Sequence, residues 1–327
     1  MGKHNLNDER NALVFSFCNW VKALQPRYFI MENVPGLKQR NNAPLLKKLL
    51  TKFKKAGYSC LEPLQILNAA DFGVPQNRRR LFILGTRKGE VPLSYPSPLF
   101  NTAPTVRDAI KDLPNLDDFP ELINRDELML KPARLEILEA SASLYVQQLR
   151  ELVISEDNYS YIRHWNPLLL TGFRRTQHTL NSIERFQNTP AGEQEKISRL
   201  RRLEWGGRCH TLRAGTGVER GSFTSARPLH PYYHRVISVR EAARLHSFPD
   251  WFRFHTTKWH GFRQVGNSVP PLLAKALGQE VMKALQVTPV KPSEVLELGN
   301  PELLKMTPTR AMREVCTFGK ETSRTKL

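Results

Sequence analysis

A glutamate at the end of an apolar stretch is the first candidate for chemistry in this sequence. Four bulky residues, 28–31, are typical of a buried strand and stand directly before Glu32 and Asn33. Pro35 and Gly36 must leave the strand, because proline fixes φ and lacks an N–H group, and glycine allows conformations closed to other residues. In open α/β sheets, ligands bind at the carboxyl ends of the strands. The pattern therefore predicts a carboxylate where a ligand can bind; a solvated glutamate in a simple turn is the alternative.

Two arginines stand in a similar position further along the chain. Arg78 and Arg80 lie in the run 76–80, at the start of a strand that we expect over 80–86. Their i, i+2 spacing predicts that both side chains point to one face of that strand. Such a pair can stabilise negative charge in a ligand, or it can simply form a charged strand edge.

The elements around these residues follow an α/β pattern. Apolar residues at helical spacing predict helices over 11–24 and 44–55, and two strands are expected over 59–67 and 80–86. Helix, strand, helix and strand pair fit one half of a doubly wound α/β domain. A complete nucleotide-binding α/β domain normally starts with a strand and a glycine-rich turn, which this pattern lacks.

Composition indicates a polyanionic partner. The 327 residues include 49 Lys and Arg against 31 Asp and Glu, a net charge of +18, and a chain this basic suggests nucleic acid. The four cysteines are scattered without a Cys-x-x-Cys pair, so neither a metal site nor a disulfide framework is expected. No apolar run reaches the length of a membrane helix. We expect a cytoplasmic protein of bacterial type, associated with the nucleoid when it is bound to DNA.

The later chain carries a basic segment and two helices with clear starts. Residues 171–240 hold thirteen Lys and Arg against five Glu, with several glycines, which suits a nucleic-acid surface. Ser238 and Glu241 form a capping-box pattern for a helix over 238–247. A second, amphipathic helix over 272–285 follows the run Gly266 to Pro271.

Four stretches in fixed order resemble the later motifs of the DNA (cytosine-5) methyltransferases. They are Glu32-Asn33-Val34, the run 76–80, the run 238–249, and Gly266-Asn-Ser-Val-Pro270. The resemblance covers residues 2–285. It implies S-adenosyl-L-methionine as cofactor, double-stranded DNA as partner and an incomplete Rossmann-like methyltransferase domain with a smaller target-recognition domain.

The resemblance also implies a domain layout. Residues 1–110 are expected to form the C-terminal half of the catalytic domain, 111–160 a helical insertion and 161–258 the target-recognition domain. Residues 259–288 then return to the catalytic domain, and 289–327 form a peripheral, partly disordered tail. A Thr-Leu pair is common near the end of such recognition domains, so Thr211, Leu212 and Arg213 are expected to bind DNA.

Roles for the motif residues follow from the family's chemistry. The family flips the target cytosine out of the duplex, and a cysteine thiolate adds to C6. The resemblance gives Glu32 the carboxyl that favours a protonated N3. Arg80, and secondarily Arg78, would stabilise the charge that develops at O2. The segment Asn267, Ser268 and Val269 would lie against the methionine part of the cofactor.

The sequence departs from the family at the nucleophile. The family's cysteine follows a proline in Pro-Cys-Gln, and none of the four cysteines here follows a proline. Residues 2–11 resemble the segment that directly follows the nucleophile loop. Three interpretations remain: the C-terminal subunit of a two-chain enzyme with an N-terminal methyltransferase subunit, a truncated gene product, or a non-catalytic DNA-binding module. We expect a methyltransferase of a restriction–modification system that is inactive alone.

Overall fold

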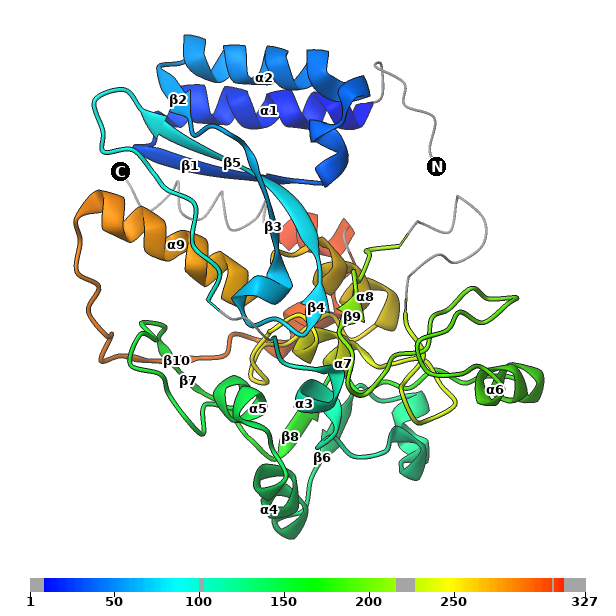
Figure 1. Cartoon of the computed structure of the whole chain (residues 1–327). Coiled ribbons are helices and arrows are strands. Elements are labelled where there is room, and N and C mark those ends of the chain that lie inside the picture. Colours follow the sequence, from blue (N-terminus) through cyan, green and yellow to red (C-terminus); the bar gives the residue numbers. More distant parts are fainter. Residues whose placement is uncertain (1–8, 100–102, 216–226, 308, 315–327) are drawn as a thin grey trace. The chain divides into compact units, whose positions relative to one another are not determined.

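The chain divides into two compact units in the computed structural model (Figure 1), which describes residues 9–99, 103–215, 227–307 and 309–314. Unit 1 comprises Met1–Ala103 and Pro271–Pro289, and unit 2 comprises Pro104–Pro270 and Val290–Leu327. Within the described ranges, no helix combines the length and the apolar character needed to cross a membrane.

Unit 1 is a small α/β unit. Its elements are α1 (Glu9–Leu24), β1 (Tyr28–Asn33), α2 (Ala43–Lys55), β2 (Tyr58–Cys60), β3 (Gln65–Asn68), β4 (Gln76–Asn77), β5 (Arg79–Arg87) and α9 (Pro271–Leu285). The long strand β5 is central, and β1, β2 and β3 all pair with it in antiparallel register. The single strand predicted over 59–67 is wrong: Pro63 separates β2 from β3, and a proline cannot donate to a strand ladder.

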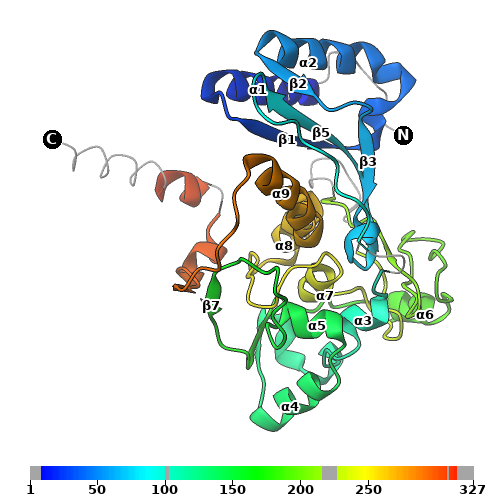
Figure 2. The same ribbon diagram turned by 60° about the vertical axis from the view of Figure 1, so that its left-hand side comes forward.

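One face of this sheet forms the main core of unit 1. Phe29 and Met31 of β1 lie opposite Gly85 and Ile83 of β5, and they pack with residues of α1 and α2 in one apolar cluster. A Cβ atom at Gly85 would lie 2.0 Å from the Phe29 ring, so only glycine leaves room for that ring. The views of Figures 1 and 2 show α1 and α2 together on this face.

The other face of the sheet carries the alternate residues of β1 and β5. Helix α9 covers it, on the side of the sheet away from α1 and α2 (Figure 2). The hydroxyl of Tyr28 donates to the carbonyl of Ala284 in α9 at 3.3 Å. Because successive strand residues alternate between faces, Glu32 belongs to this second face.

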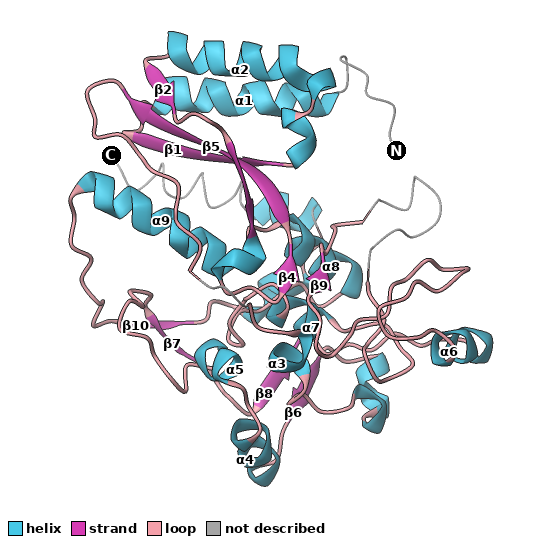
Figure 3. Cartoon of the chain, viewed as in Figure 1, coloured by secondary structure: helices cyan, strands magenta, loops and turns pink. Residues whose placement is uncertain are grey.

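Unit 2 consists of short elements joined by long loops (Figure 3). They are α3 (Val106–Ile110), β6 (Glu127–Met129), α4 (Pro132–Ala140), α5 (Leu144–Leu149), β7 (Ile162–His164), β8 (Leu169–Thr171), α6 (Leu180–Gln187), β9 (Cys209–His210), α7 (Val239–Arg244), α8 (Lys258–Asn267) and β10 (Val295–Glu297). We expected a helical segment over 111–160. It contains helices but also the strand β6, which pairs with β8.

Residues 295–304 contact other parts of unit 2. Strand β10 pairs in parallel with β7, and Val295 lies opposite Ile162. The N–H group of Thr256 also donates to the carbonyl of Leu304 at 3.3 Å. These residues complete a strand pair at the surface, where Val295 stays 56% exposed.

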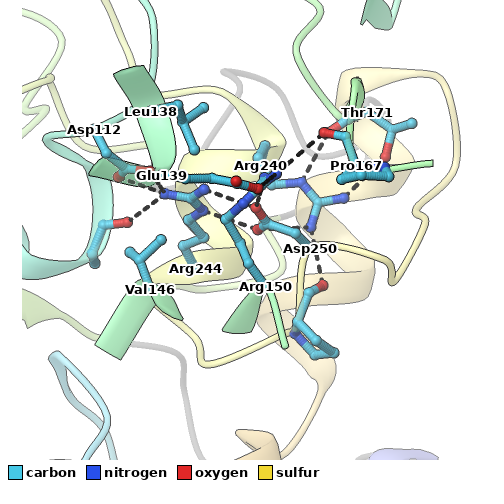
Figure 4. A network of polar contacts seen from close by, with 12 residues as sticks. Asp112, Leu138, Glu139, Val146, Arg150, Pro167, Thr171, Arg240, Arg244 and Asp250 are labelled. Carbon is cyan, nitrogen blue, oxygen red and sulfur yellow. Dashed lines mark hydrogen bonds and ion pairs between the residues drawn. The ribbon is translucent and has the colours of Figure 1, made fainter. Parts of the chain in front are cut away.

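A buried ion network occupies the centre of unit 2 (Figure 4). The guanidinium of Arg244 donates to both oxygens of Asp112, at 2.6 and 2.7 Å, and to both oxygens of Asp250, at 2.9 and 2.7 Å. Arg150 reaches the same Asp250 carboxylate at 3.0 Å. Removing one partner from such a network leaves a buried charge uncompensated, which typically costs about 3–5 kcal/mol.

Candidate active site

Glu32 and Arg80 form an ion pair on the second face of the unit 1 sheet. In the antiparallel register Glu32 lies opposite Phe82, so Arg80, two residues earlier on β5, is its diagonal neighbour on the same face. The Nε atom of Arg80 lies 2.7 Å from Oε1 of Glu32. Both side chains keep some exposure, 14% for Arg80 and 27% for Glu32, so the pair remains accessible to a ligand.

Arg78 lies close to this pair but not on the strand. It falls between β4 and β5, so the prediction that one strand carries both arginines is wrong. Only 2% of Arg78 is exposed. Burial and the charge of Arg80, opposed by Glu32, lower the pKa of its guanidinium to about 10. The three predicted side chains are therefore near enough to feel one another's charge.

The turn after β1 fixes the direction of Glu32. The side-chain Oδ1 of Asn33 accepts a hydrogen bond from the N–H of Val34 at 2.8 Å. A short 3₁₀-helix, Pro35–Lys38, begins directly afterwards and buries Leu37. The side chain of Asn33 therefore helps to form the turn.

The three candidate cofactor residues lie at the end of α8 in unit 2. Asn267 is the last helical residue, and the hydroxyl of Ser268 donates to the carbonyl of Val265 at 2.7 Å. The carbonyl of Ser268 also lies 3.1 Å from Nε2 of His246. The exposed Asn267 amide and this capped helix end can hydrogen-bond charged groups such as the carboxylate and ammonium of a methionine moiety.

The candidate DNA-binding segment contacts the candidate cofactor segment. Residues 211–213 directly follow β9, and Leu212 is buried with 2% exposure. A Cβ atom at Gly266 would lie only 2.4 Å from the carbonyl carbon of Arg213 and from the nitrogen of Ala214. The glycine of the Gly-Asn-Ser-Val motif therefore permits a close backbone contact that sequence reasoning did not find.

The described cysteines are poor nucleophiles. Cys18 and Cys209 are buried, and Cys60 is half-buried. Burial raises the pKa of all three thiols, that of Cys60 to about 12. Since the thiolate is the reactive form, these environments do not favour addition to a base. Cys316 lies outside the described residues, and no cluster of metal-ligand type occurs among the described ones.

The fold agrees with comparisons against known proteins. The family model for C-5 cytosine-specific DNA methylases matches residues 1–283. The chain therefore belongs to the C-5 cytosine-specific DNA methylase family, which uses S-adenosyl-L-methionine as methyl donor. A crystal structure of an E. coli prophage DNA modification methyltransferase has the same α/β methyltransferase fold, with a TM-score of 0.66 and 31% identity over 86% of this chain and 76% of that chain.

Two curated relatives extend the comparison. Type II methyltransferase M.XorII of Xanthomonas oryzae pv. oryzae is 48% identical over 311 residues, which is 95% of this chain and 71% of the relative. Type II methyltransferase M.AgeI of Thalassovita gelatinovora is 28% identical over 349 residues, which is 87% of this chain and 80% of the relative. DNA is the substrate class that the family implies.

Proposed function

We propose that this chain provides the carboxylate and arginine side of the cytosine site in a Type II DNA (cytosine-5) methyltransferase. The observation that carries the proposal is the Glu32–Arg80 ion pair of 2.7 Å with Arg78 nearby, in a chain of the C-5 cytosine-specific family. The names of the relatives M.XorII and M.AgeI support a place in a restriction–modification system. Their bacterial sources support a cytoplasmic location.

Glu32 acts on the N3 edge of the flipped cytosine in this proposal. Arg80 occupies Oε1 of Glu32 through its Nε atom and so orients the carboxyl group. The second carboxyl oxygen is then available to the base, where a protonated carboxyl group donates to N3. General acid catalysis by a positioned carboxyl group contributes on the order of 10²–10⁴ in rate.

The two arginines stabilise charge at O2 of the ring. Nucleophilic addition at C6 moves electron density into the ring and towards O2, and a guanidinium already in place lowers the energy of that state. Arg80 is the main candidate because it is partly exposed and ion-paired to Glu32. Arg78 is deeply buried and is therefore the second candidate for this role.

S-adenosyl-L-methionine, when bound, supplies the methyl group that C5 receives. Within this chain, Asn267, Ser268 and Val269 are the residues proposed to hold its methionine part. The exposed amide of Asn267 and the backbone at the end of α8 suit a zwitterionic ligand. The Gly266 contact with Arg213 connects this segment to the proposed DNA-binding residues Thr211, Leu212 and Arg213.

We further propose that the thiolate nucleophile comes from polypeptide other than these 327 residues. No cysteine of the sequence follows a proline, and burial raises the thiol pKa of the three described ones. The chain alone is then inactive, and a partner carrying a Pro-Cys-Gln loop completes the site. The same cysteine environments also favour a second candidate function, that of a non-catalytic DNA-binding module.

Reconstitution distinguishes these possibilities. The purified chain is incubated with labelled S-adenosyl-L-methionine and mixed-sequence DNA, with and without a fragment of a relative that ends just after its Pro-Cys-Gln loop. We expect label in cytosine only when the fragment is present, and none when its cysteine is replaced by alanine. Label without the fragment would refute the missing nucleophile. A folded, DNA-binding pair without activity would instead favour the non-catalytic module.

A further inference from the structure

A cluster of half-buried cations lies in unit 2, away from the residues assigned above. Arg174 and Arg175 follow β8, Arg227 belongs to the segment before α7, and Lys258 is the first residue of α8. The ammonium group of Lys258 donates to the carbonyl of Arg175 at 3.0 Å. The guanidinium of Arg227 stands over the Phe262 ring, 5.8 Å from its centroid. The loop after β8 and the start of α8 therefore meet at this cluster.

Three of these cations have no carboxylate partner among the described residues. Arg175 is paired with Asp117 at 3.2 Å, and the neighbouring Arg235 is paired with Glu241 at 2.9 Å. In the described part of the chain, by contrast, no carboxylate lies within ion-pair distance of Arg174, Arg227 or Lys258. The guanidinium of Arg174 donates to a backbone carbonyl, that of Ile123, at 3.2 Å.

The positive charges of this cluster disfavour further protonation of Lys258 and His178. Burial, together with the charges of Arg227 and Arg174, lowers the pKa of Lys258 to about 8. His178, which faces the same cluster, has its pKa lowered to about 4 by burial, Arg227 and Lys258, with Asp117 opposing. The imidazole is therefore neutral at neutral pH. An anion bound here would relieve the mutual repulsion of the cations.

A cavity of about 680 Å³ adjoins the cluster, and Arg175 and His178 line it. Its other walls carry Asp117, the partner of Arg175, together with groups that hydrogen-bond and stack, including Gln177, Tyr232 and His234. Ligand sites in proteins commonly have volumes of this order. The combination of unpaired cations and a polar, aromatic cavity suits a phosphate joined to a sugar better than a small inorganic anion.

We propose that Arg174, Arg227 and Lys258 bind a backbone phosphate of the substrate DNA, and that the adjoining cavity receives the deoxyribose attached to it. The inference rests on the proposed function, because a DNA methyltransferase must hold a duplex. Phosphate contacts fix the register of a protein on DNA without reading its sequence. We call these three residues the phosphate clamp; they position the DNA and take no part in the chemistry.

The salt dependence of DNA binding tests the phosphate clamp. Each neutralised phosphate adds about 0.9 to the magnitude of the slope of log K against log salt. The full chain is compared with Lys258→Gln and Arg227→Gln, and with Lys305→Gln as a control that removes the same charge from an exposed residue paired with Glu302 at 2.7 Å. Because the three cations share one phosphate, we expect each clamp variant to lower the slope by a part of that 0.9, and the control to leave it unchanged.

Two outcomes would overturn the proposal. An unchanged slope in a folded clamp variant excludes a phosphate contact, and an equal fall in Lys305→Gln shows that only net charge matters. Thermal unfolding identifies any clamp variant that does not fold. The slope of the other clamp variant then decides whether the proposal holds.

Lysine acylation of the unmodified chain at pH 8 gives a test that needs no mutation. We expect duplex DNA to protect Lys258 and not the exposed Lys283, and equal labelling of Lys258 with and without DNA would contradict the clamp. Methylation by the reconstituted pair is read separately. If the reconstituted pair methylates DNA but the clamp variants leave the salt-dependence slope unaltered, only the phosphate clamp is refuted. If the clamp variants alter the slope but the reconstituted pair does not methylate DNA, only the proposed catalytic function is refuted.

Discussion

The Nε atom of Arg80 lies 2.7 Å from Oε1 of Glu32, across the diagonal of the β1–β5 strand pair. Neither residue determines this contact alone, because it depends on the register that places Glu32 opposite Phe82. A shift of that register by one residue would turn one of the two side chains to the apolar face. The core packing of Phe29 against Gly85 therefore also aligns the ion pair.

Replacing Glu32 by glutamine should slow methyl transfer far more than it weakens DNA binding. An amide can still hydrogen-bond the base but cannot donate a proton to N3, so we expect single-turnover rates of the reconstituted pair to fall on the order of 10²–10⁴. Glu90→Gln is the matched control, because Glu90 is also paired with arginines in unit 1. Equal rates for Glu32→Gln and the unmodified pair would remove Glu32 from the mechanism.

Arg80 and Arg78 should differ in what their loss affects. We expect Arg80→Ala to lower the single-turnover rate about 10²–10³-fold and to change the free energy of unfolding by less than about 1 kcal/mol, because the side chain is partly exposed. Arg78→Ala removes a buried side chain and should destabilise the chain by about 2–4 kcal/mol. Urea unfolding measures the stability of both variants. Equal losses of stability in Arg80→Ala and Arg78→Ala would contradict these expectations.

Glu241 should make the stability of unit 2 depend on acidic pH. Burial raises its pKa, but Arg235 and the Ser238 cap outweigh burial and hold the pKa at about 2. Because the folded pKa lies below the unfolded value of about 4.5, Glu241 stabilises the fold above pH 4.5, and this contribution is lost as pH falls towards 2. The nearby His230 has a pKa of about 3 and is neutral over most of that range.

The test compares the unmodified chain with Glu241→Gln. Leaving Arg235 buried and unpaired should cost about 3–5 kcal/mol at pH 7. The difference in the free energy of unfolding should shrink as pH is lowered from 4.5 towards 2. A difference that stays constant over this range would show that the Glu241–Arg235 pair does not titrate as expected.

Gly266→Ala should be destabilising. The new Cβ atom would lie 2.4 Å from two backbone atoms at Arg213 and Ala214, and these cannot move as freely as a side chain. Overpacking of this kind typically costs about 1–3 kcal/mol. Gly278→Ala is the matched control: its Cβ meets nothing within 4 Å in α9, so alanine should stabilise that helix by about 0.5–1 kcal/mol. Thermal unfolding that ranks the two variants the other way would contradict the close contact.

Local signals in the sequence predicted several elements well. The apolar run ended by Pro35 predicted β1, and helical spacing predicted α2 and α9 to within a residue or two. The capping box of Ser238 and Glu241 is confirmed at the start of α7. These features depend on residues near one another in the chain, which is why pattern reasoning detects them.

Features that depend on distant partners could not be predicted in the same way. Helix α8 contains Gly261 and Gly266, which lower helix propensity and are explained by close packing against residues far away in the sequence. Arg244 and Asp250 look like surface charges until Asp112 is placed beside them. The position of Arg78 between two strands likewise follows from how β4 and β5 end, and not from its spacing to Arg80.

The strand pair β7–β10 has a consequence for how unit 2 can be exchanged between relatives. The chain passes between the units at 103–104, 270–271 and 289–290, so unit 2 is encoded by two separate stretches of the gene. Recombination that exchanged only residues 104–270 between relatives would import a foreign β7 and retain the native β10. Such a recombinant would carry a mismatched strand pair. A well-folded product would need a third crossover beyond residue 289, which brings in the matching β10. Alternatively, the native β10 would have to pair with β7 strands of different sequence.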